Sequence, residues 1–230
     1  MTANHGNPLS IRVFFDPICP WCYIGYDRLK QVLDDGFRGQ VEVIWHGFQL
    51  NPDMPAQGMD RKLYLYQKFG GEAGYHNAYR PIIEAAAAQN TPLKLDAITL
   101  TPQTSSAHIL LNLIQESAGS AAAEKFAVLL FERYFEAGQD ISNADLLISL
   151  AVEAGFDEKI ARSFLSADGT QEAFEDEAVL KASQRLQQDR LMASQLGING
   201  VPFYIFNDRY SLAGAASVQN IRSVLESFSA

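Results

Sequence analysis

The sequence has little cysteine, little positive charge and no long hydrophobic run. Its 230 residues include only two cysteines, and 18 Lys and Arg against 27 Asp and Glu give a net charge of −9. This charge argues against nucleic acid and anionic membranes as partners. No apolar run approaches the ~18 residues that a membrane-spanning helix needs. We therefore expect a protein that binds neither nucleic acid nor membranes.

Other absences limit the class of enzyme and the compartment. The sequence lacks the GxSxG, P-loop and GxGxxG-plus-acid patterns of hydrolases, NTPases and dinucleotide-binding enzymes. Its first residues, MTANHGNPLSIRVFFD, show no basic segment followed by an apolar one, so no signal peptide is expected. We expect a cytoplasmic protein, in which paired cysteines are more often catalytic or metal-binding than structural.

Both cysteines, Cys19 and Cys22, lie in the stretch DPICPWCYIG. Three interpretations are open: half of a metal site, a redox pair, or coincidence. A structural zinc site needs four ligands. The histidines that could complete it are dispersed and form no H-x₃₋₅-H pair: His5, His46, His76 and His108. The spacing therefore favours a redox pair without a metal.

The N-terminal segment is predicted to form a β-α-β unit. Residues Leu9–Phe15 are apolar and rich in branched and aromatic side chains, which is typical of a buried strand. A helix is expected to begin at about Pro20 and to end near Gly36. Residues Val41–Trp45 predict the next strand, which should lie parallel to the first.

Helical patterns dominate from about Asn51 to Leu196, with a break at Gly70-Gly71. Candidate boundaries of helices in this block are Thr101 or Thr104, Ser142–Asp145, Asp157, Thr170 and Gly197.

The end of the chain returns to strands. Val201–Phe206 and Tyr210–Ala213 predict two strands joined through Asn207-Asp208, and Ser217–Phe228 predicts a closing helix. The order β-α-β, helices, β-β-α indicates an α/β sheet domain interrupted by a helical block.

The two thiols occupy different positions in the predicted helix. Cys19 lies at or just before the first turn, where unpaired backbone N–H groups and the helix dipole favour a thiolate. Cys22 follows one turn later, within reach of the Cys19 sulfur. We therefore predict that Cys19 attacks a disulfide and that Cys22 resolves the resulting mixed disulfide.

Two motifs resemble a known family. FDPICPWCYIG after the first strand and GINGVPFYIF near the C-terminus are similar to the DsbA-like branch of the thioredoxin superfamily, and within it to FrnE-type predicted dithiol-disulfide isomerases. Three further stretches fit this resemblance: GFQLNPDM at 47–54, TPQTSSAH at 101–108 and YFEAGQDIS at 134–142. The resemblance therefore extends over almost the whole chain.

The resemblance implies a thioredoxin-like fold, β-α-β … β-β-α, with a large inserted all-helical domain. Residues 1–52 and 190–230 would form the thioredoxin-like domain, and residues 53–189 the insertion. It also implies a cis Val201–Pro202 bond packed against the cysteines. Val201 and Pro202, together with Pro20 and Trp21, would then bind an extended peptide or glutathione beside Cys19.

The sequence departs from the family at two places. Trp21 stands where the best-known DsbA active site has histidine, and an indole offers one N–H donor but no positive charge. We therefore expect a pair that is less oxidising than that of DsbA, with Trp21 either contacting substrate or simply packing. Gln103 stands where close relatives are expected to have asparagine, which leaves open a polar contact near the site.

Other residues are weaker candidates. Asp16 could tune a thiol or shuttle a proton, although a turn role is favoured for an Asp-Pro pair. His46 and His108 are expected to be structural. Five aromatic residues could line a groove over the cysteines or pack the helical block: Tyr64, Tyr66, Phe69, Tyr75 and Tyr79.

The sequence thus predicts a thiol-disulfide oxidoreductase or isomerase, a monomer or homodimer. It would need no bound cofactor and would act on protein or peptide thiols and disulfides, with glutathione or another thiol as co-substrate. One alternative is a glutathione-dependent isomerase or transferase acting on a small aromatic substrate, as in 2-hydroxychromene-2-carboxylate isomerases and kappa-class glutathione transferases, where serine usually replaces the first cysteine. A second alternative is a non-catalytic chaperone or binding module.

Overall fold

The computed structural model describes residues 8–166 and 177–228 of the chain. Its main sheet has four strands in the order β2-β1-β5-β6. β1 (Leu9–Phe15) and β2 (Val41–Gly47) are parallel, and α1 (Pro20–Val32) connects them, as the sequence predicts. A π-helical turn at Leu33–Phe37, in which Gly36 has a φ of 127°, ends this helix.

The C-terminal strands form the predicted hairpin. β5 (Phe203–Phe206) pairs antiparallel with β1, and β6 (Tyr210–Ala213) pairs antiparallel with β5. Asn207 and Asp208, with φ of 48° and 55°, make the tight turn between them. The prediction that the strand begins at Val201 is wrong: it begins at Phe203, because Pro202 has no N–H for the strand ladder.

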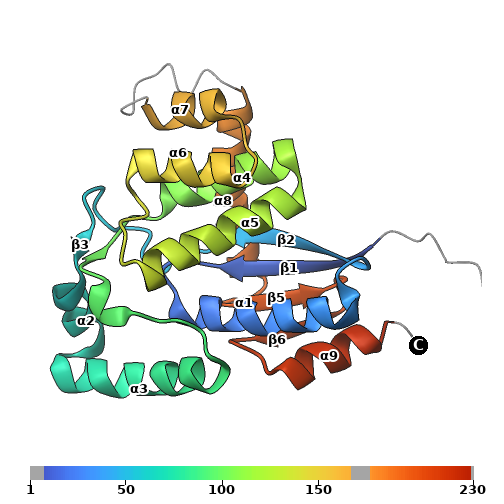
Figure 1. The fold of residues 1–230 in the computed structure, drawn as a ribbon, viewed down its shortest axis with the longest axis horizontal. Helices are drawn as coiled ribbons and strands as arrows, with labels where there is room; N and C mark the ends of the chain where they lie inside the picture. The colour runs from blue at the N-terminus through green and yellow to red at the C-terminus, as the bar shows by residue number, and fades with distance from the viewer. Residues whose placement is uncertain (1–7, 167–176, 229–230) are drawn as a thin grey trace, which may run out of the picture.

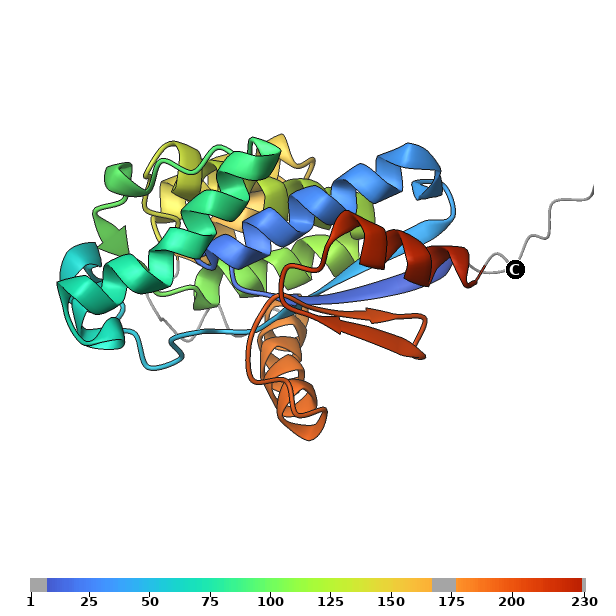
Figure 2. The same ribbon diagram turned by 90° about the horizontal axis from the view of Figure 1, so that it is seen from below.

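Helices cover both faces of the sheet. α9 (Val218–Glu226) begins after Ser217, whose hydroxyl accepts a hydrogen bond from the Asn220 N–H at 3.2 Å. It lies beside α1 on one face, and α8 (Glu177–Gln195) lies on the other side of the strands (Figures 1 and 2). This arrangement leaves the N-terminal end of α1 at the edge of the sheet domain.

In the described residues between β2 and α8 the chain is mainly helical, as predicted, with one small two-stranded sheet. The helices of this segment are α2 (Arg61–Phe69), α3 (Glu72–Gln89), α4 (Ser105–Ala118), α5 (Ser120–Phe131), α6 (Ala144–Glu153) and α7 (Glu158–Ser166), with short turns of 3₁₀ helix at Leu95–Ala97 and π-helix at Glu132–Glu136. β3 (Met59–Asp60) and β4 (Leu100–Thr101) pair antiparallel. Two-residue strands are too short to produce an alternating pattern, so the sequence did not predict them.

Most of the predicted helix boundaries in this block are confirmed. Gly70 and Gly71, with φ of 74° and 101°, separate α2 from α3. α4 begins after Thr104 rather than Thr101, and the side chain of Asn143 caps α6 by accepting from the Leu146 N–H. The carboxylate of Asp157 accepts from the first amides of α7. Gly197 follows the end of α8, and the boundary predicted at Thr170 lies outside the described residues.

Two clusters of buried side chains hold the molecule together. The larger one joins the sheet to α1, α4, α5 and α6, with Trp45 and Phe131 completely buried at its centre. The smaller one packs the α2–α3 pair against Ile24 of α1 through Leu65 and Ile82. It fixes α2 and α3 across the N-terminal end of α1, as Figures 1 and 2 show.

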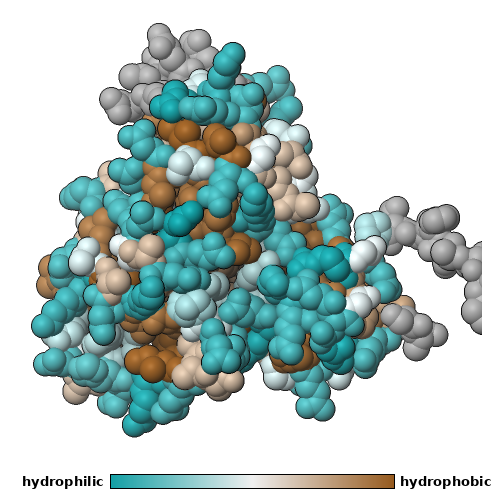
Figure 3. Space-filling model, viewed as in Figure 1, coloured by the Kyte–Doolittle hydropathy of each residue, from teal (hydrophilic) through white to brown (hydrophobic). Residues whose placement is uncertain are grey.

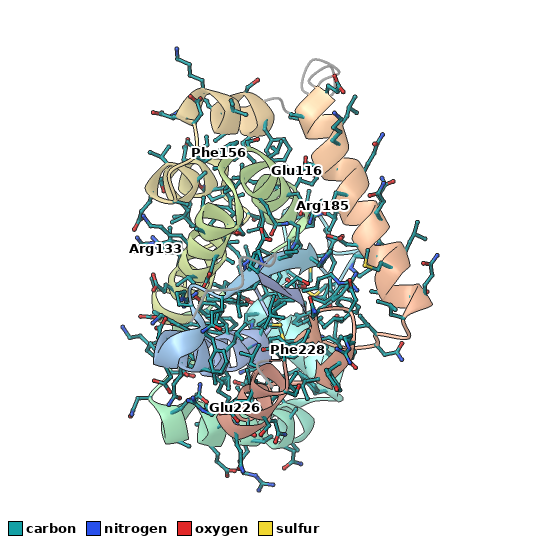
Figure 4. All side chains as sticks on the ribbon, turned by 90° about the vertical axis from the view of Figure 1, so that its right-hand side faces the viewer. Glu116, Arg133, Phe156, Arg185, Glu226 and Phe228 are labelled. Atoms are coloured by element: carbon teal, nitrogen blue, oxygen red, sulfur yellow. The ribbon has the colours of Figure 1, made fainter. Side chains whose placement is uncertain are left out.

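Polar contacts attach α8 to the rest of the block. Glu116 of α4 and Arg185 of α8 face each other in Figure 4 and form an ion pair at 3.5 Å. The Asn112 side-chain amide also donates to the Ala182 carbonyl at 3.1 Å.

The order and pairing of these elements confirm the predicted α/β sheet with a helical insertion. The division of the chain at residues 52/53 and 189/190 stays a prediction.

Two observations concern the hydrophobicity of the described helices and of the molecular surface. No helix within residues 8–166 or 177–228 is both long and apolar enough to cross a bilayer. On the face seen in Figure 3, hydrophobic residues form separate patches among hydrophilic ones, and one patch lies where α3 runs in Figure 1.

Candidate active site

Cys19 is the N-cap residue of α1, immediately before its first turn. Its φ and ψ of −89° and 113° are extended, and Pro20 follows as the first helical residue. The Cys19 N–H donates to the Asp16 carbonyl at 3.0 Å, and the Cys19 carbonyl accepts from the Cys22 N–H at 2.9 Å. The Asp-Pro turn and the proline at the first helical position thus place Cys19 where the sequence predicts it.

Cys22 lies behind Cys19, inside the core. The two cysteines are 3.6 Å apart and are free thiols rather than a disulfide. Burial raises the pKa of Cys22 well above its ordinary value, and the adjacent Cys19 raises it further. Only Cys19 lines the neighbouring cavity. The pair therefore has one thiol that faces the cavity and one that faces the interior.

The Val201–Pro202 loop lies directly beside Cys19. The predicted cis bond between these residues is present. The Cys19 thiol donates to the Val201 carbonyl over 3.5 Å, and Gly200 and Val201 line the same cavity. The Gly214 N–H donates to the Pro202 carbonyl at 2.8 Å, which ties the loop to the residue after β6. The structure thus brings together the two motifs that are furthest apart in the sequence.

Asp16 is completely buried beneath the cysteines. Its carboxylate accepts from the Leu50 N–H at 2.7 Å and from the Ile18 N–H at 3.3 Å, so the predicted turn role is confirmed. Burial raises the pKa of Asp16 to about 7 in spite of these bonds. The negative charge of Asp16 also raises the pKa of Cys22, whereas a hydrogen bond from the Asp16 backbone lowers it by more. Asp16 can therefore exchange a proton near neutral pH beside the inner thiol.

His108 stands on the far side of Asp16. Its Nε2 lies 3.8 Å from the Asp16 carboxylate, and neither ring nitrogen has a hydrogen-bond partner among the described residues. Burial lowers the pKa of His108 to about 4, so the ring is neutral at physiological pH. It packs edge-on against Phe15. Its predicted place in the core is confirmed, next to the acid rather than the thiols.

His46 lies away from the cysteines. Its Nδ1 is 2.7 Å from the Asp189 carboxylate, and the Gly47 N–H donates to the other oxygen of that carboxylate at 2.9 Å. The ring stacks on Phe14. His46 therefore joins β2 to α8, and its predicted structural role is confirmed.

Gln103 likewise makes a local contact. Its side chain accepts from the Ser105 N–H at 3.0 Å and donates to the Ser105 hydroxyl at 2.6 Å. It supports the start of α4 and is not part of the cavity lining.

A cavity of about 280 Å³ separates the N-terminal end of α1 from α2 and α3. Trp21 lines it, together with three of the five predicted aromatic residues, Tyr64, Phe69 and Tyr79. Tyr66 and Tyr75 line a different pocket, on the other side of the α2–α3 pair. Tyr79 also belongs to the smaller core cluster, and Tyr64, Phe69 and Tyr75 pack against it, so four of the five aromatic residues pack the helical block as well.

Sequence reasoning missed three residues near the thiols. Arg61 and Lys68 line the cavity, and the Tyr204 hydroxyl is buried without a hydrogen-bond partner among the described residues. Burial raises the pKa of Tyr204, and Cys22 raises it further. A signal for the two cations existed: Arg61, Tyr64, Leu65, Lys68 and Phe69 recur at helical spacing, and all of them line the cavity.

Comparison with models of protein families shows the family of this chain. The model for the DSBA-like thioredoxin domain matches residues 10–226. The chain belongs to this family. Its thioredoxin-like fold, predicted from the resemblance, is confirmed, and members of the family are enzymes of the oxidoreductase or isomerase type.

Individual relatives and solved structures are distant in sequence. The uncharacterized protein YwbO of Bacillus subtilis is 25% identical over 216 residues, which are 90% of this chain and 91% of that one. The probable DsbA oxidoreductase SCO1869 of Streptomyces coelicolor has a TM-score of 0.78 at 24% identity, covering 95% and 89% of the two chains.

Two other solved structures match over nearly their whole length. One is a 2-hydroxychromene-2-carboxylate isomerase, with a TM-score of 0.68 at 15% identity and coverage of 96% of both chains. The other is the cytosolic disulfide reductase DsbM of Pseudomonas aeruginosa with GSH, with a TM-score of 0.64 at 17% identity and coverage of 95% and 98%. At these identities the likeness is one of fold.

Proposed function

We propose that this protein is a thiol-disulfide oxidoreductase in which Cys19 attacks and Cys22 resolves. The observation that carries the proposal is the asymmetry of the pair: Cys19 begins α1 and faces the cavity, whereas Cys22 is buried behind it with a raised pKa. A substrate can reach only the first sulfur, and the second stays protonated until it is needed.

The reaction has two exchange steps. The Cys19 thiolate attacks one sulfur of a substrate disulfide, forms a mixed disulfide and releases the other sulfur as a thiolate. Cys22 then attacks Cys19, which forms the Cys19–Cys22 disulfide and releases the second substrate thiolate. The substrate gains two electrons and the protein loses two. A thiol such as glutathione returns the pair to the reduced state, and no bound cofactor is needed.

Asp16 would accept the Cys22 proton in the second step. Its pKa of about 7 leaves a substantial ionised fraction at neutral pH, and its charge already acts on the Cys22 thiol. A base is most effective when its pKa lies near the working pH. Ionised Asp16 therefore suits the removal of one proton from a buried thiol.

The remaining predicted site residues would hold the substrate. Pro20, Trp21 and Val201 line the cavity, and Pro202 follows Val201 in the loop beside Cys19. We propose protein, peptide or small thiols and disulfides as partners, a cytoplasmic location, and a monomer or homodimer. The match to a cytosolic disulfide reductase with GSH is compatible with this setting.

The first test is an equilibrium redox titration in glutathione buffers, read by alkylation and intact mass. A single two-electron transition that is lost in Cys19→Ser and in Cys22→Ser is the expected result. Cys22→Ser should accumulate a mixed disulfide at Cys19, whereas Cys19→Ser should accumulate none. Two thiols that stay free under oxidising conditions would contradict the proposal.

The aromatic lining of the cavity favours one second candidate, a glutathione-dependent isomerase acting on a small aromatic molecule. Such an enzyme would use glutathione as a bound cofactor and would not need a resolving thiol. Isomerase turnover that persists in Cys22→Ser would support it against the redox mechanism. The chaperone alternative predicts client binding that survives replacement of both cysteines by alanine.

A further inference from the structure

The cavity beside Cys19 carries positive charge without any acidic residue in its lining. Arg61 and Lys68 are the charged residues that line it, and its other walls are apolar, aromatic or backbone. This is unexpected in a chain with a net charge of −9. The positive charge of Lys68 lowers the pKa of Asp16, so these two groups interact. Asp16 is nevertheless completely buried and does not line the cavity. The cavity is therefore electrostatically suited to an anion.

Arg61 is a buried guanidinium with neutral partners. Its side chain donates to the Tyr79 hydroxyl at 2.6 Å and to the Thr101 hydroxyl at 3.2 Å. The rings of Tyr64, Tyr79 and Tyr134 surround it at 5.8–5.9 Å. Only 6% of the residue is exposed, and no carboxylate of the described residues lies within 4.0 Å. A buried charge is costly unless an opposite charge compensates it. Glu72 and Asp96 line the second pocket that Arg61 also lines, but neither forms an ion pair with it, and the wall that faces Cys19 offers no carboxylate.

Lys68 extends the positive charge along the same face of α2. Its ammonium donates to the Tyr64 hydroxyl at 2.7 Å, and it forms no ion pair with the described carboxylates. One turn of helix separates it from Tyr64, and two turns separate it from Arg61. The two cations and the tyrosine between them thus form one wall of the cavity, and Cys19 belongs to another.

We propose that the cavity binds an organic carboxylate with an apolar or aromatic body, joined through sulfur to the disulfide that Cys19 attacks. The carboxylate would pair with Arg61 and Lys68, and the body would lie against Trp21, Phe69 and Ile82. Arginine suits this role because its planar fork can hold a carboxylate with two hydrogen bonds. The inference rests on the proposed function and specifies its substrate as a small anionic disulfide.

The chemistry follows the exchange already described. Cys19 attacks the bound disulfide, the first aryl thiolate leaves, and the mixed disulfide keeps the second aryl carboxylate in the cavity. Cys22 then releases this second thiolate and leaves the Cys19–Cys22 disulfide. The small disulfide gains the two electrons that the protein loses.

The test compares 4,4′-dithiodibenzoate with its uncharged bis-amide as substrates of the reduced protein, with thiol release followed by absorbance. Reaction of each compound with free dithiothreitol gives the intrinsic ratio of reactivities. We expect the protein to favour the carboxylate over the amide by about tenfold or more beyond that ratio, as expected for a hydrogen-bonded buried charge. Arg61→Gln and Lys68→Gln should each lower this preference, and high salt should lower it only partly.

One further variant serves as the control. Lys62→Gln removes an exposed cation of the same helix that lines the pocket on the other side and not this cavity, so its preference should equal that of the parent protein. If Arg61→Gln fails to fold, Lys68→Gln still decides, because Lys68 is exposed. A preference no greater than that of dithiothreitol, or one that Lys68→Gln leaves unchanged, overturns the anion site. If both compounds nevertheless oxidise the Cys19–Cys22 pair, the proposed function stands without it.

Discussion

Replacing Asp16 with asparagine tests whether the acid beneath the thiols is destabilised by burial. The pKa of Asp16 rises from 3.8 to about 7 because the carboxylate is completely buried. Folding therefore favours the protonated acid. Between pH 3.8 and 7 the folded protein binds more protons than the unfolded chain, so this group lowers the free energy of unfolding as the pH rises through that window. Above pH 7 the free energy of unfolding is lowered by the full cost of burying the ionised carboxylate.

The size of the effect follows from the shift. About three pKa units at 1.36 kcal/mol each amount to about 4 kcal/mol at pH 8, and about 3 kcal/mol of this develops between pH 5 and pH 8. Asparagine keeps one acceptor oxygen, but its NH2 group cannot accept a hydrogen bond. Either the Leu50 N–H or the Ile18 N–H therefore loses its partner, which costs about 1–3 kcal/mol at every pH. The variant should therefore gain stability relative to the parent as the pH rises.

The assay is urea unfolding of both proteins in the reduced state at pH 5, 6, 7 and 8. The quantity of interest is the difference between the two free energies of unfolding at each pH. His108 has the opposite pH dependence, since burial lowers its pKa to about 4. Because its Nε2 lies 3.8 Å from Asp16, the comparison is made in a His108→Gln background, which removes this contribution from both proteins. A difference that changes by less than about 1 kcal/mol between pH 5 and 8 would refute the argument.

The same variant should slow the second exchange step. Without a carboxylate at position 16, the Cys22 proton loses its nearby acceptor, so the release of a substrate thiolate from Cys19 should lose its dependence on a group of pKa about 7. Attack by Cys19, measured by trapping in a Cys22→Ser background, provides the comparison. Equal rates of resolution in the two proteins at pH 7 would exclude Asp16 as the proton acceptor.

Two further predictions concern α1. Trp21→His should raise the reduction potential of the Cys19–Cys22 pair by about 30 mV or more, because histidine can stabilise a thiolate whereas the indole carries no charge. A titration in glutathione buffers measures this potential. Trp21→Phe, which adds no cation, is the control and should show no such rise. Gly25→Ala should destabilise the fold by about 1–3 kcal/mol in urea unfolding, because the new Cβ would lie 2.4 Å from the Tyr204 hydroxyl and 3.0 Å from Pro202. Gly39→Ala, whose Cβ would meet nothing within 4 Å, is the control and should change stability by less than about 0.5 kcal/mol.

The parts of the structure that the sequence predicts well are those with local causes. Leu9–Phe15 reads as a strand from its own side chains, and Pro20 and Ser217 mark helix starts through their own backbone chemistry. The β5–β6 turn follows from Asn207-Asp208, two residues that tolerate a positive φ. In each case the decisive interactions join residues only a few positions apart. The side-chain pattern places the start of this strand at Val201, two residues too early, because it carries no information on the N–H that Pro202 lacks.

The electrostatics of the site could not be predicted because they depend on residues far apart in the chain. Asp16 owes its raised pKa to complete burial; its neighbours include His108, 92 positions away, and Leu50, 34 positions away, whose N–H bond offsets part of the rise. Arg61 has the neutral groups of Tyr79, Thr101 and Tyr134 around it and no paired carboxylate among the described residues. The cysteine motif identifies the reaction, since its chemistry lies within four residues. The proposed choice of substrate rests on the opposite wall of the cavity, where α2 brings positive charge to a thiol 42 positions earlier in the chain.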